Sequence, residues 1–269
     1  DIVVISRRTG LDLAAPDLAE SRRRLAGCDA VVLCAGINRE SGRQTYGRVH
    51  VSATRFIVEA ARDSGVQRVV LLSFLRARPD GPTAYHRSKW IAEEIVRASG
   101  LPYTIVKPGV IFGRGDHLID HLSRALRTFP VFGLLGGRPR LVAPLAVQDV
   151  ARLLAAVAVG DPRLRDRTIA LTGPEVMDLE DAVRRVGQAI DRHPTYVRLP
   201  IPAHLVIAWV AEHLMRIPLI ALAQVSILEE GATEVLPFGE VPPVDLAPTI
   251  LFDRASILAG LPPDAGGFG

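Results

Sequence analysis

The sequence predicts an α/β fold built on a doubly wound parallel sheet, and two observations carry this prediction. Short, unbroken apolar runs alternate with longer stretches of helical periodicity along most of the 269 residues. Strands covered by helices on both faces read as unbroken apolar runs, and helical crossovers between strands make those strands parallel. Apolar residues form 48% of the chain and charged residues 23%, a balance that favours a globular protein with a large core.

The pattern places each element in turn. Strands are expected at 2–5, 30–34, 69–72, 103–106 and 168–171. Helices are expected at about 51–63, 83–98, 118–127, 147–159 and 179–190. Gly65 follows the first helix as a C-terminal cap, and Asp178 precedes the last one as an N-cap. The Pro/Gly-rich stretch 129–140 is expected to be a loop.

Two domains are expected along the chain. Residues 1–195 would form the sheet domain, which also contributes loops to the substrate side, and residues 196–269 a small C-terminal substrate-side subdomain. The apolar stretch 203–225 is the best membrane candidate, but charged residues and a proline interrupt it. Because charges are costly inside a bilayer, an amphipathic packing helix is the better interpretation. Weak attachment to a membrane or to a membrane complex stays open.

Charge and cysteine content narrow the function classes. The net charge is only +3, and no arginine run is longer than 22–24, whereas nucleic-acid-binding proteins gather positive charge on one face. We therefore expect no nucleic-acid partner. Cys28 and Cys34 are too few for a disulfide framework and lack the neighbours of a zinc site, so we expect no metal and a reducing, cytoplasmic location. Asp1 leads directly into a strand-like run, which does not resemble a signal peptide.

Tyr85 and Lys89 are the sharpest chemical feature of the sequence. On a helix, residues four apart lie on the same face, one turn from each other. The lysine ammonium would lower the pKa of the phenol, which could then pass a proton to or from a substrate oxygen. A solvated tyrosine and lysine on a helix surface would give the same pattern. Two facts favour the functional interpretation: only Lys89 and Lys107 among the 32 basic residues are lysines, and Tyr85 follows the expected strand end at Ser73 by twelve residues.

The order of these residues carries a family resemblance. Ser73, Tyr85-x-x-x-Lys89 and the run 107–113 (KPGVIFG) follow one another as in extended and atypical short-chain dehydrogenases/reductases, which the chain resembles. Segments 34–40 (CAGINRE) and 73–79 (SFLRARP) make it similar to bacterial relatives of the NAD(P)H-binding accessory subunit of respiratory complex I. The resemblance covers nearly the whole chain, and its motifs are specific as a set.

The resemblance implies roles for these positions. Tyr85 would be the catalytic acid/base, Lys89 its pKa-lowering and ribose-binding partner, and Ser73 a catalytic hydroxyl beside the nicotinamide. Further cofactor contacts are implied for Ala35, Gly36, Pro108, Gly109 and Val110. His50 stands where many extended members carry an asparagine.

The residues after the first expected strand bear on the choice of cofactor. An acidic residue at this point holds the ribose 2′-hydroxyl in dinucleotide-binding folds, whereas arginine accommodates a 2′-phosphate. Here the strand is followed by Ser6, Arg7 and Arg8, and the next acid is Asp12. NADP(H) is therefore favoured over NAD(H), with these four residues as cofactor-binding candidates. An ordinary solvated arginine pair is the alternative.

One required motif is missing from the sequence. A Rossmann-type domain carries a glycine-rich phosphate-binding loop between its first strand and first helix. No Gly-x-Gly-x-x-Gly or Gly-x-x-Gly-x-x-Gly segment leads a helix here. We therefore expect an N-terminally truncated fragment whose sheet lacks its first strand and which keeps only the nicotinamide and ribose half of the cofactor site.

Different classes of function stay open. The leading hypothesis is an NAD(P)(H)-dependent oxidoreductase or epimerase-like enzyme acting on a small or prenyl-like polar molecule. The alternative is a non-catalytic NAD(P)H-binding module that supports a respiratory or other membrane-associated complex. Phe74 favours this alternative, because many family members carry the catalytic serine at the second residue after the strand. A third hypothesis is that the fragment binds no cofactor.

Overall fold

The computed structural model describes residues 1–116, 118–136, 139–200, 202–204, 206, 233, 237 and 239–262. The helices within these residues are η1 (Arg7–Thr9), α1 (Leu18–Leu25), the π-helix η2 (Gly47–Ser52), α2 (Ala53–Asp63), α3 (Ala84–Arg97), α4 (Leu118–Thr128), α5 (Val147–Val159), η3 (Pro162–Leu164), α6 (Leu179–Ala189), η4 (Val244–Leu246) and α9 (Arg254–Gly260). The strands are β1 (Ala30–Leu33), β2 (Arg68–Leu72), β3 (Tyr103–Pro108), β4 (Ile111–Phe112), β5 (Val131–Leu135), β6 (Leu141–Val142), β7 (Leu145–Ala146), β8 (Arg167–Leu171), β9 (Met177–Asp178) and β10 (Thr195–Leu199).

The chain folds into two compact units that alternate along the sequence. The first unit comprises Asp1–Pro108, Ala151–Leu171 and Val235–Leu246. The second comprises Gly109–Val150, Thr172–Glu234 and Ala247–Gly269. This division differs from the consecutive domains 1–195 and 196–269 that the sequence predicts. The expected boundary followed a change in local pattern, whereas compact units form from segments that contact each other across long stretches of chain.

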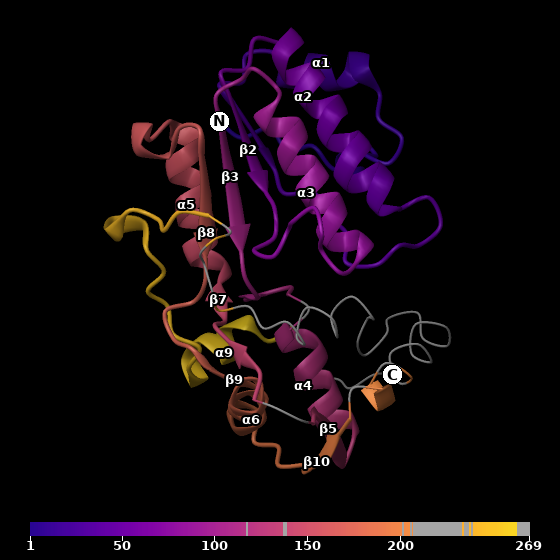
Figure 1. The fold of residues 1–269 in the computed structure, drawn as a ribbon, viewed down its shortest axis with the longest axis vertical. Helices are drawn as coiled ribbons and strands as arrows, with labels where there is room; N and C mark the ends of the chain where they lie inside the picture. Colours follow the sequence, from indigo (N-terminus) through magenta and orange to yellow (C-terminus); the bar gives the residue numbers. More distant parts are fainter. Residues whose placement is uncertain are drawn as a thin grey trace. The chain divides into compact units, whose positions relative to one another are not determined.

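A four-stranded parallel sheet organises the first unit, in the order β1-β2-β3-β8. Its register pairs Val70 of β2 with both Val32 of β1 and Thr104 of β3. Helices α1, α2 and α3 pack against this sheet (Figure 1), and their apolar side chains share one buried cluster with those of β1, β2 and β3. The predicted parallel α/β fold is thereby confirmed, together with the four strands expected from residue 30 onward.

The strand expected at 2–5 is wrong. This segment pairs with no strand of the described residues, and Ile2, Val3 and Val4 are exposed, Ile2 by 91%. Ile5 alone packs against the apolar cluster of the first unit. A β-strand is stable only where a neighbour satisfies its N–H and C=O groups. Within the described ranges β1 also pairs on one side only, with β2, so an apolar run here did not suffice to make a strand.

The helices of the first unit follow the predicted pattern with one change. The helix expected from 51 begins earlier, because the π-helix η2 leads directly into α2. Gly65 adopts φ +75°, the left-handed conformation that suits its predicted capping role. Helix α3 agrees with the predicted 83–98 to within a residue at each end. The sequence therefore located the helix that carries Tyr85 and Lys89.

The second unit is assembled from short strand pairs and helices. Strand β4 pairs parallel with β7, β5 parallel with β10, and β6 antiparallel with β9. Its core holds Phe112 and Phe252, whose ring centroids lie 4.9 Å apart, edge to face. Helix α4 is confirmed, and Asp178 caps α6 as predicted, since its side chain accepts a hydrogen bond from the Glu180 amide.

Two expectations fail in the second unit for one reason. The stretch 129–140 was expected to be a loop, but it contains β5. The region from 196 was expected to begin a helical subdomain, but it starts within β10, which pairs with β5. More than 50 residues of chain separate these two strands. Each strand depends on the other, and neither segment shows that dependence in its own sequence.

The apolar stretch 203–225 lies almost wholly outside the described residues. Within the ranges that the structure covers, no helix combines the length and the apolar character needed to cross a bilayer.

Asp149, at the start of α5, ties two distant segments of the second unit together. Its side chain is buried, and Oδ2 accepts hydrogen bonds from the Thr249 and Ile250 amides, both at 3.0 Å. Asp149→Ala should lower the free energy of unfolding by about 1–3 kcal/mol, because two partly buried N–H groups lose their side-chain acceptor. The measurement is the urea midpoint followed by circular dichroism. Asp149→Asn keeps an acceptor oxygen and should lose less, and equal stability of Asp149→Ala and wild type would contradict this role.

Candidate functional site

Helix α3 carries Tyr85 and Lys89 on one face. The Thr83 side chain accepts the His86 amide and so starts the helix, which places Tyr85 in its first turn. Tyr85, Lys89 and Glu93 follow at intervals of four and are all buried, with 8%, 6% and 0% of their surface exposed. The predicted shared face is therefore confirmed. The catalytic roles assigned to Tyr85 and Lys89 stay predictions.

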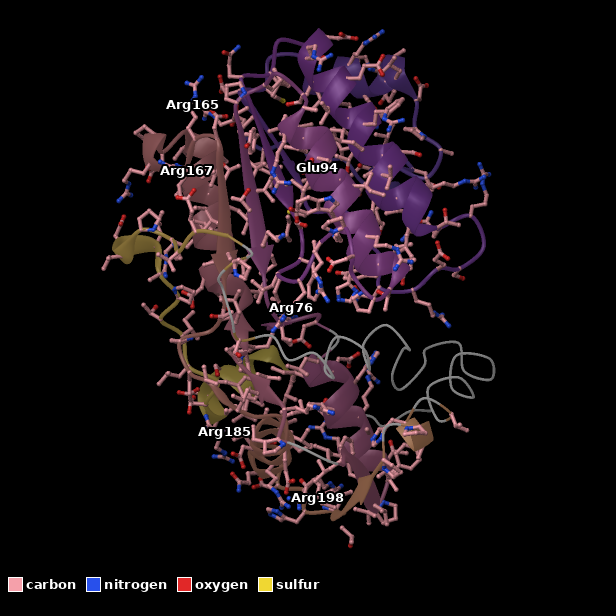
Figure 2. All side chains as sticks on the ribbon, viewed as in Figure 1. Arg76, Glu94, Arg165, Arg167, Arg185 and Arg198 are labelled. Atoms are coloured by element: carbon pink, nitrogen blue, oxygen red, sulfur yellow. The ribbon has the colours of Figure 1, made fainter. Side chains whose placement is uncertain are left out.

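Both lysines of the chain are buried, unlike many of its arginines. Arg167 and Arg198 (Figure 2) form exposed ion pairs with glutamates, and such pairs contribute little to stability. Lys89 and Lys107 are only 6% and 1% exposed. An ammonium is compact and can lose its proton, whereas a guanidinium is large and stays charged. The rarity of lysine therefore marks two buried positions where these properties matter.

The Lys89 ammonium lies at the carboxyl ends of two strands. Its Nζ donates a hydrogen bond to the Leu72 carbonyl at the end of β2, at 3.1 Å. A Cβ on Gly36, in the segment after β1, would lie 3.3 Å from the same Nζ. Burial lowers the pKa of Lys89 to about 8, while the Glu93 carboxylate acts in the opposite direction. Gly36 thus lies directly beside Lys89, the neighbouring Ala35 is exposed, and the cofactor contacts implied for both residues stay predictions.

Tyr85 lies among aromatic rings. The ring centroids of Phe74, His50 and Tyr46 lie 5.4, 5.6 and 5.8 Å from that of Tyr85, all edge to face. Burial raises the pKa of Tyr85, and Tyr46 adds to this effect. The direction is opposite to the one predicted from Lys89, because a phenolate in this buried environment would lose its solvation. Tyr85 is therefore a neutral phenol.

His50 connects the segment after β1 to α3. Its Nε2 accepts a hydrogen bond from the Ile37 amide at 3.0 Å, so Nδ1 carries the proton and faces Ser88 Oγ at 2.9 Å. Ser88 Oγ in turn donates to the Tyr85 carbonyl at 2.8 Å. Burial and the charge of Lys89 lower the pKa of His50 to about 3, so the imidazole is neutral at physiological pH. His50 thereby holds the Gly36 segment against Lys89.

Ser73 and Phe74 have different neighbours from those that the resemblance implies: the Ser73 hydroxyl contacts Glu93, and the Phe74 ring contacts Tyr85. The Ser73 hydroxyl donates to Glu93 Oε1 at 2.5 Å, and its amide donates to the Val106 carbonyl at 2.8 Å. The neighbour of Tyr85 is instead the Phe74 ring. The structure does not bring the predicted catalytic hydroxyl of Ser73 to the phenol, because that hydroxyl is bound to a buried carboxylate.

The residues proposed to select the cofactor lie near the start of the first unit. Ser6 caps η1 by exchanging hydrogen bonds with Thr9, and Arg7 and Arg8 are exposed. The Asp12 carboxylate accepts the Ala14 amide at 2.9 Å, which together with the nearby Arg7 lowers the pKa of Asp12. Arg7 and Arg8 form no ion pair within the described residues.

Pro108, Gly109 and Val110 span the point where the two units join in the chain. Pro108 ends β3, and its carbonyl accepts a hydrogen bond from the Leu75 amide at 2.9 Å. The Val110 carbonyl accepts the Leu145 amide at 2.9 Å. Gly109, which lies between Pro108 and Val110 in the sequence, is buried. The carbonyls of Pro108 and Val110 thus each use one lone pair within the protein, and the cofactor contacts implied for this segment stay predictions.

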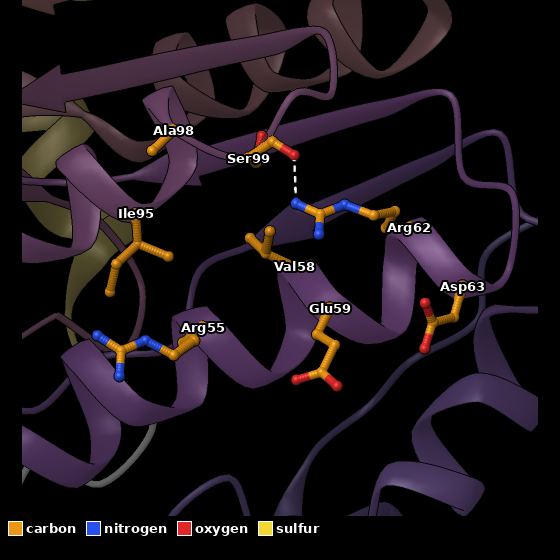
Figure 3. A pocket seen from close by; sticks show the side chains of 8 residues that line it. All are labelled: Arg55, Val58, Glu59, Arg62, Asp63, Ile95, Ala98 and Ser99. Carbon is orange, nitrogen blue, oxygen red and sulfur yellow. Dashed lines mark hydrogen bonds between the residues drawn. The ribbon is translucent and has the colours of Figure 1, made fainter.

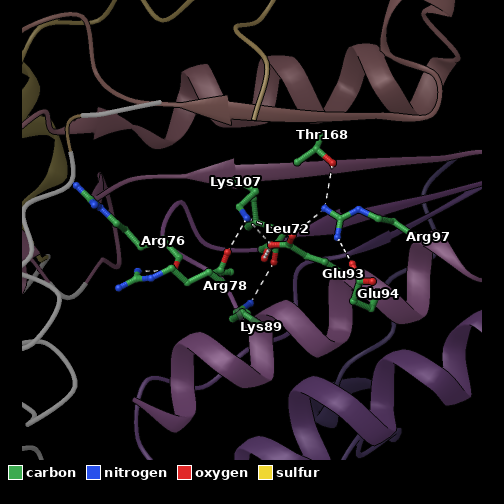
Figure 4. A network of polar contacts seen from close by, with 11 residues as sticks. Leu72, Arg76, Arg78, Lys89, Glu93, Glu94, Arg97, Lys107 and Thr168 are labelled. Atoms are coloured by element: carbon green, nitrogen blue, oxygen red, sulfur yellow. Dashed lines mark hydrogen bonds and ion pairs between the residues drawn. The ribbon is translucent and has the colours of Figure 1, made fainter. Parts of the chain in front are cut away.

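Sequence reasoning missed a buried polar cluster next to Lys89, which we call the Glu93 network and define as Ser73, Glu93, Arg97 and Lys107. Figure 4 labels the last three of these residues. Glu93 accepts from Lys107 Nζ at 3.1 Å and from Arg97 Nη2 at 2.9 Å. Lys107 Nζ also donates to the Ala77 carbonyl at 2.9 Å. The signal that could have found the network was available, because Lys107 is as rare a lysine as Lys89.

A hollow of about 360 Å³ lies between α2 and α3, away from these groups (Figure 3). Its lining residues are Arg55, Val58, Glu59, Arg62, Asp63, Ile95, Ala98 and Ser99. Arg62 donates to the Ser99 carbonyl across it. Acidic and basic groups alternate along the hollow, and it includes none of the predicted site residues, so it is not the site described here.

Comparisons with known proteins agree with the fold and the cofactor class. A family model described as NAD(P)H-binding matches residues 6–125. The mouse mitochondrial NADH dehydrogenase (ubiquinone) 1 alpha subcomplex subunit 9 is 27% identical over 210 residues, which cover 77% of this chain and 54% of that protein. Ceramide reductase of Caulobacter vibrioides is 31% identical over 199 residues, 72% of this chain and 60% of that protein. The chain spans about half the length of the curated relatives it matches.

Solved structures share the fold at low identity. UDP-glucuronic acid 4-epimerase from Bacillus cereus, in complex with NAD, matches with a TM-score of 0.65 and 14% identity over 93% of this chain and 77% of that one. An NADPH-dependent quinone oxidoreductase from Escherichia coli, complexed with NADPH, matches with a TM-score of 0.67 and 18% identity over 92% and 81%. Residues 6–125 thus match an NAD(P)H-binding family, and the chain is distantly related to the complex I subunit and shares its fold with sugar epimerases.

Proposed function

We propose that this chain is the catalytic body of an NAD(P)(H)-dependent oxidoreductase or epimerase-like enzyme in which Tyr85 and Lys89 act as an acid–base pair. The observation that carries the proposal is the position of the Lys89 ammonium, between the Leu72 carbonyl and Gly36 at the ends of β2 and β1. Ligands of parallel α/β sheets bind outside the carboxyl ends of the strands. A buried cation beside a segment without a side chain suits a ribose that approaches closely.

Tyr85, Lys89 and His50 each have a separate role in the proposed reaction. The nicotinamide, when bound, supplies or accepts a hydride at the substrate carbon. Tyr85, a neutral phenol, donates the proton that the reduced substrate oxygen needs. Lys89 binds the ribose hydroxyls and stabilises the phenolate left behind. His50 holds the Gly36 segment in place through the Ile37 amide.

The proposed cofactor is NADP(H) rather than NAD(H). Arg7 and Arg8 are exposed and form no ion pair within the described ranges, which leaves two cations for a 2′-phosphate. The Asp12 carboxylate accepts hydrogen bonds from the Ala14 amide and from Gln44, and neither Arg7 nor Arg8 donates a hydrogen bond to it.

Removal of the Tyr85 hydroxyl tests the catalytic proposal. In the complete protein, Tyr85→Phe should lower NADPH turnover at least about a hundredfold, because positioned proton transfer contributes on that scale. Turnover is followed by NADPH absorbance with a water-soluble quinone, a ceramide and a UDP-sugar, the substrate classes named for the relatives. Tyr103→Phe, on β3, is the matched control and should retain activity. Unchanged turnover in Tyr85→Phe would remove this residue from the mechanism.

The cofactor proposal has a separate test. The double variant Arg7→Ser, Arg8→Ser should raise the Kd of NADPH about tenfold or more and leave that of NADH within about twofold, because only NADPH presents a phosphate to the lost charges. Fluorescence titration gives both values. The double variant Arg22→Ser, Arg23→Ser, at two arginines of α1 in exposed ion pairs, removes the same number of charges and controls for the change in net charge. Equal weakening of both cofactors would contradict the assignment.

One observation favours a second function, a non-catalytic NAD(P)H-binding module that supports a membrane-associated respiratory complex. Phe74 contacts Tyr85 where a hydroxyl would polarise a carbonyl, and the mouse relative reported above is named as a subunit of NADH dehydrogenase (ubiquinone). This function predicts tight NADPH binding, no turnover on the same substrate panel, and co-purification of the complete protein with a membrane complex. Rapid turnover by a protein that stays in the soluble fraction would exclude it.

A further inference from the structure

The Lys89 ammonium needs support that its own hydrogen bond does not supply. Burial opposes the charged form, and Nζ donates to one carbonyl, that of Leu72. Hydrogen bonding to a neutral carbonyl offsets only part of the lost hydration of an ammonium. Other ionisable groups must therefore decide whether this lysine is charged when it meets a ligand.

The groups that face Lys89 come from three elements. Cys34 follows β1, His50 lies on η2, and Glu93 lies one turn further along α3. His50 is neutral, and the pKa of the Cys34 thiol lies above its usual value. Glu93 is thus the one carboxylate among the described residues that favours the Lys89 ammonium.

Glu93 is itself fixed from several sides. It is fully buried and accepts hydrogen bonds from Ser73 Oγ, Lys107 Nζ and Arg97 Nη2. These donors come from the end of β2, from β3 and from the next turn of α3. Lys89 and Glu93 therefore contact adjacent residues at the end of β2: Lys89 contacts Leu72 (Figure 4), and Glu93 contacts Ser73.

We propose that Glu93 is a positioning residue: its buried carboxylate keeps the Lys89 ammonium charged and directed at the end of β2. The mechanism is electrostatic and needs no contact between Glu93 and a ligand. Lys107 and Arg97 hold the carboxylate so that it keeps this place. The consequence for cofactor binding rests on the proposed function, but the effect on Lys89 does not.

The sign of the pH dependence follows from this arrangement. Below pH about 8 Lys89 is charged, and above it the ammonium loses its proton and a donor. Removal of the Glu93 charge takes away attraction, so the Lys89 pKa should fall further. A merely structural role would act in the opposite direction, because a loosened, hydrated site lets the pKa rise toward its ordinary value of 10.5.

The chain offers a direct measurement, because it contains only two lysines. In the 269-residue chain labelled with 13C,15N-lysine, Lys89→Met identifies the Lys89 signal, and NMR follows that signal against pH. The midpoint should be near pH 8 in wild type and lower by about one unit or more in Glu93→Gln. Glu94→Gln, the neighbouring exposed carboxylate that pairs with Arg97, is the matched control and should leave the midpoint unchanged. A midpoint that stays or rises in Glu93→Gln overturns the proposal.

A second variant covers the case in which Glu93→Gln does not fold. The double variant Glu93→Gln, Lys107→Met removes both members of the buried pair, so Lys107 is not left without its counter-charge. It leaves Lys89 as the one lysine of the chain, and its midpoint should again lie below that of wild type. A midpoint at or above the wild-type value in this variant counts against the proposal equally.

Cofactor affinity separates this proposal from the proposed function. Wild-type affinity for NADPH should weaken above pH about 8, and in Glu93→Gln at a correspondingly lower pH. If the NMR midpoints shift as expected but affinity does not follow them, Glu93 still positions Lys89 and the ribose-binding role of Lys89 fails. If the midpoints do not shift, the positioning role fails whatever the turnover of Tyr85→Phe.

Discussion

The buried Glu93 carboxylate is the interaction on which the candidate site depends. Through Ser73 and Lys107 it joins α3 to β2 and β3, and Arg97 extends the connection to Thr168 of β8 at 3.2 Å. A buried ion pair gains little net stability, because desolvation offsets the attraction, but breaking one partner costs about 3–5 kcal/mol. Its effect is therefore to select one arrangement of helix and strands over others. That arrangement fixes the depth at which Lys89 meets the strand ends.

The sequence predicted those parts of the fold that local pattern decides. The strands from residue 30 onward and the helix carrying Tyr85 formed where apolar runs and caps placed them. The failures at 2–5 and 129–140 have a common physical origin. A strand requires hydrogen bonds from another segment, so the apolar run at 2–5 stays unpaired while the Pro/Gly-rich stretch forms β5 against the distant β10.

The same distinction explains which site residues could be found. Tyr85 and Lys89 were identified because their spacing is local and lysine is rare. Ser73 was assigned from its order in the chain, but order does not reveal that its hydroxyl turns to Glu93 while Phe74 meets Tyr85. His50 connects the Gly36 segment to Ser88 of α3 only because η2 packs against α3. No short sequence motif encodes that packing.

The aromatic surroundings of Tyr85 bear on the direction of the proposed reaction. A phenol whose pKa is raised by burial keeps its proton at neutral pH, so the acid form that a developing alkoxide needs is present, although it is a weaker acid than a solvated phenol. Hydride transfer from the reduced nicotinamide to a carbonyl carbon creates such an alkoxide. Oxidation would instead require the phenolate, which burial of Tyr85 and the nearby Tyr46 disfavour. The proposed reaction would therefore start from the protonated phenol, in the direction of carbonyl reduction.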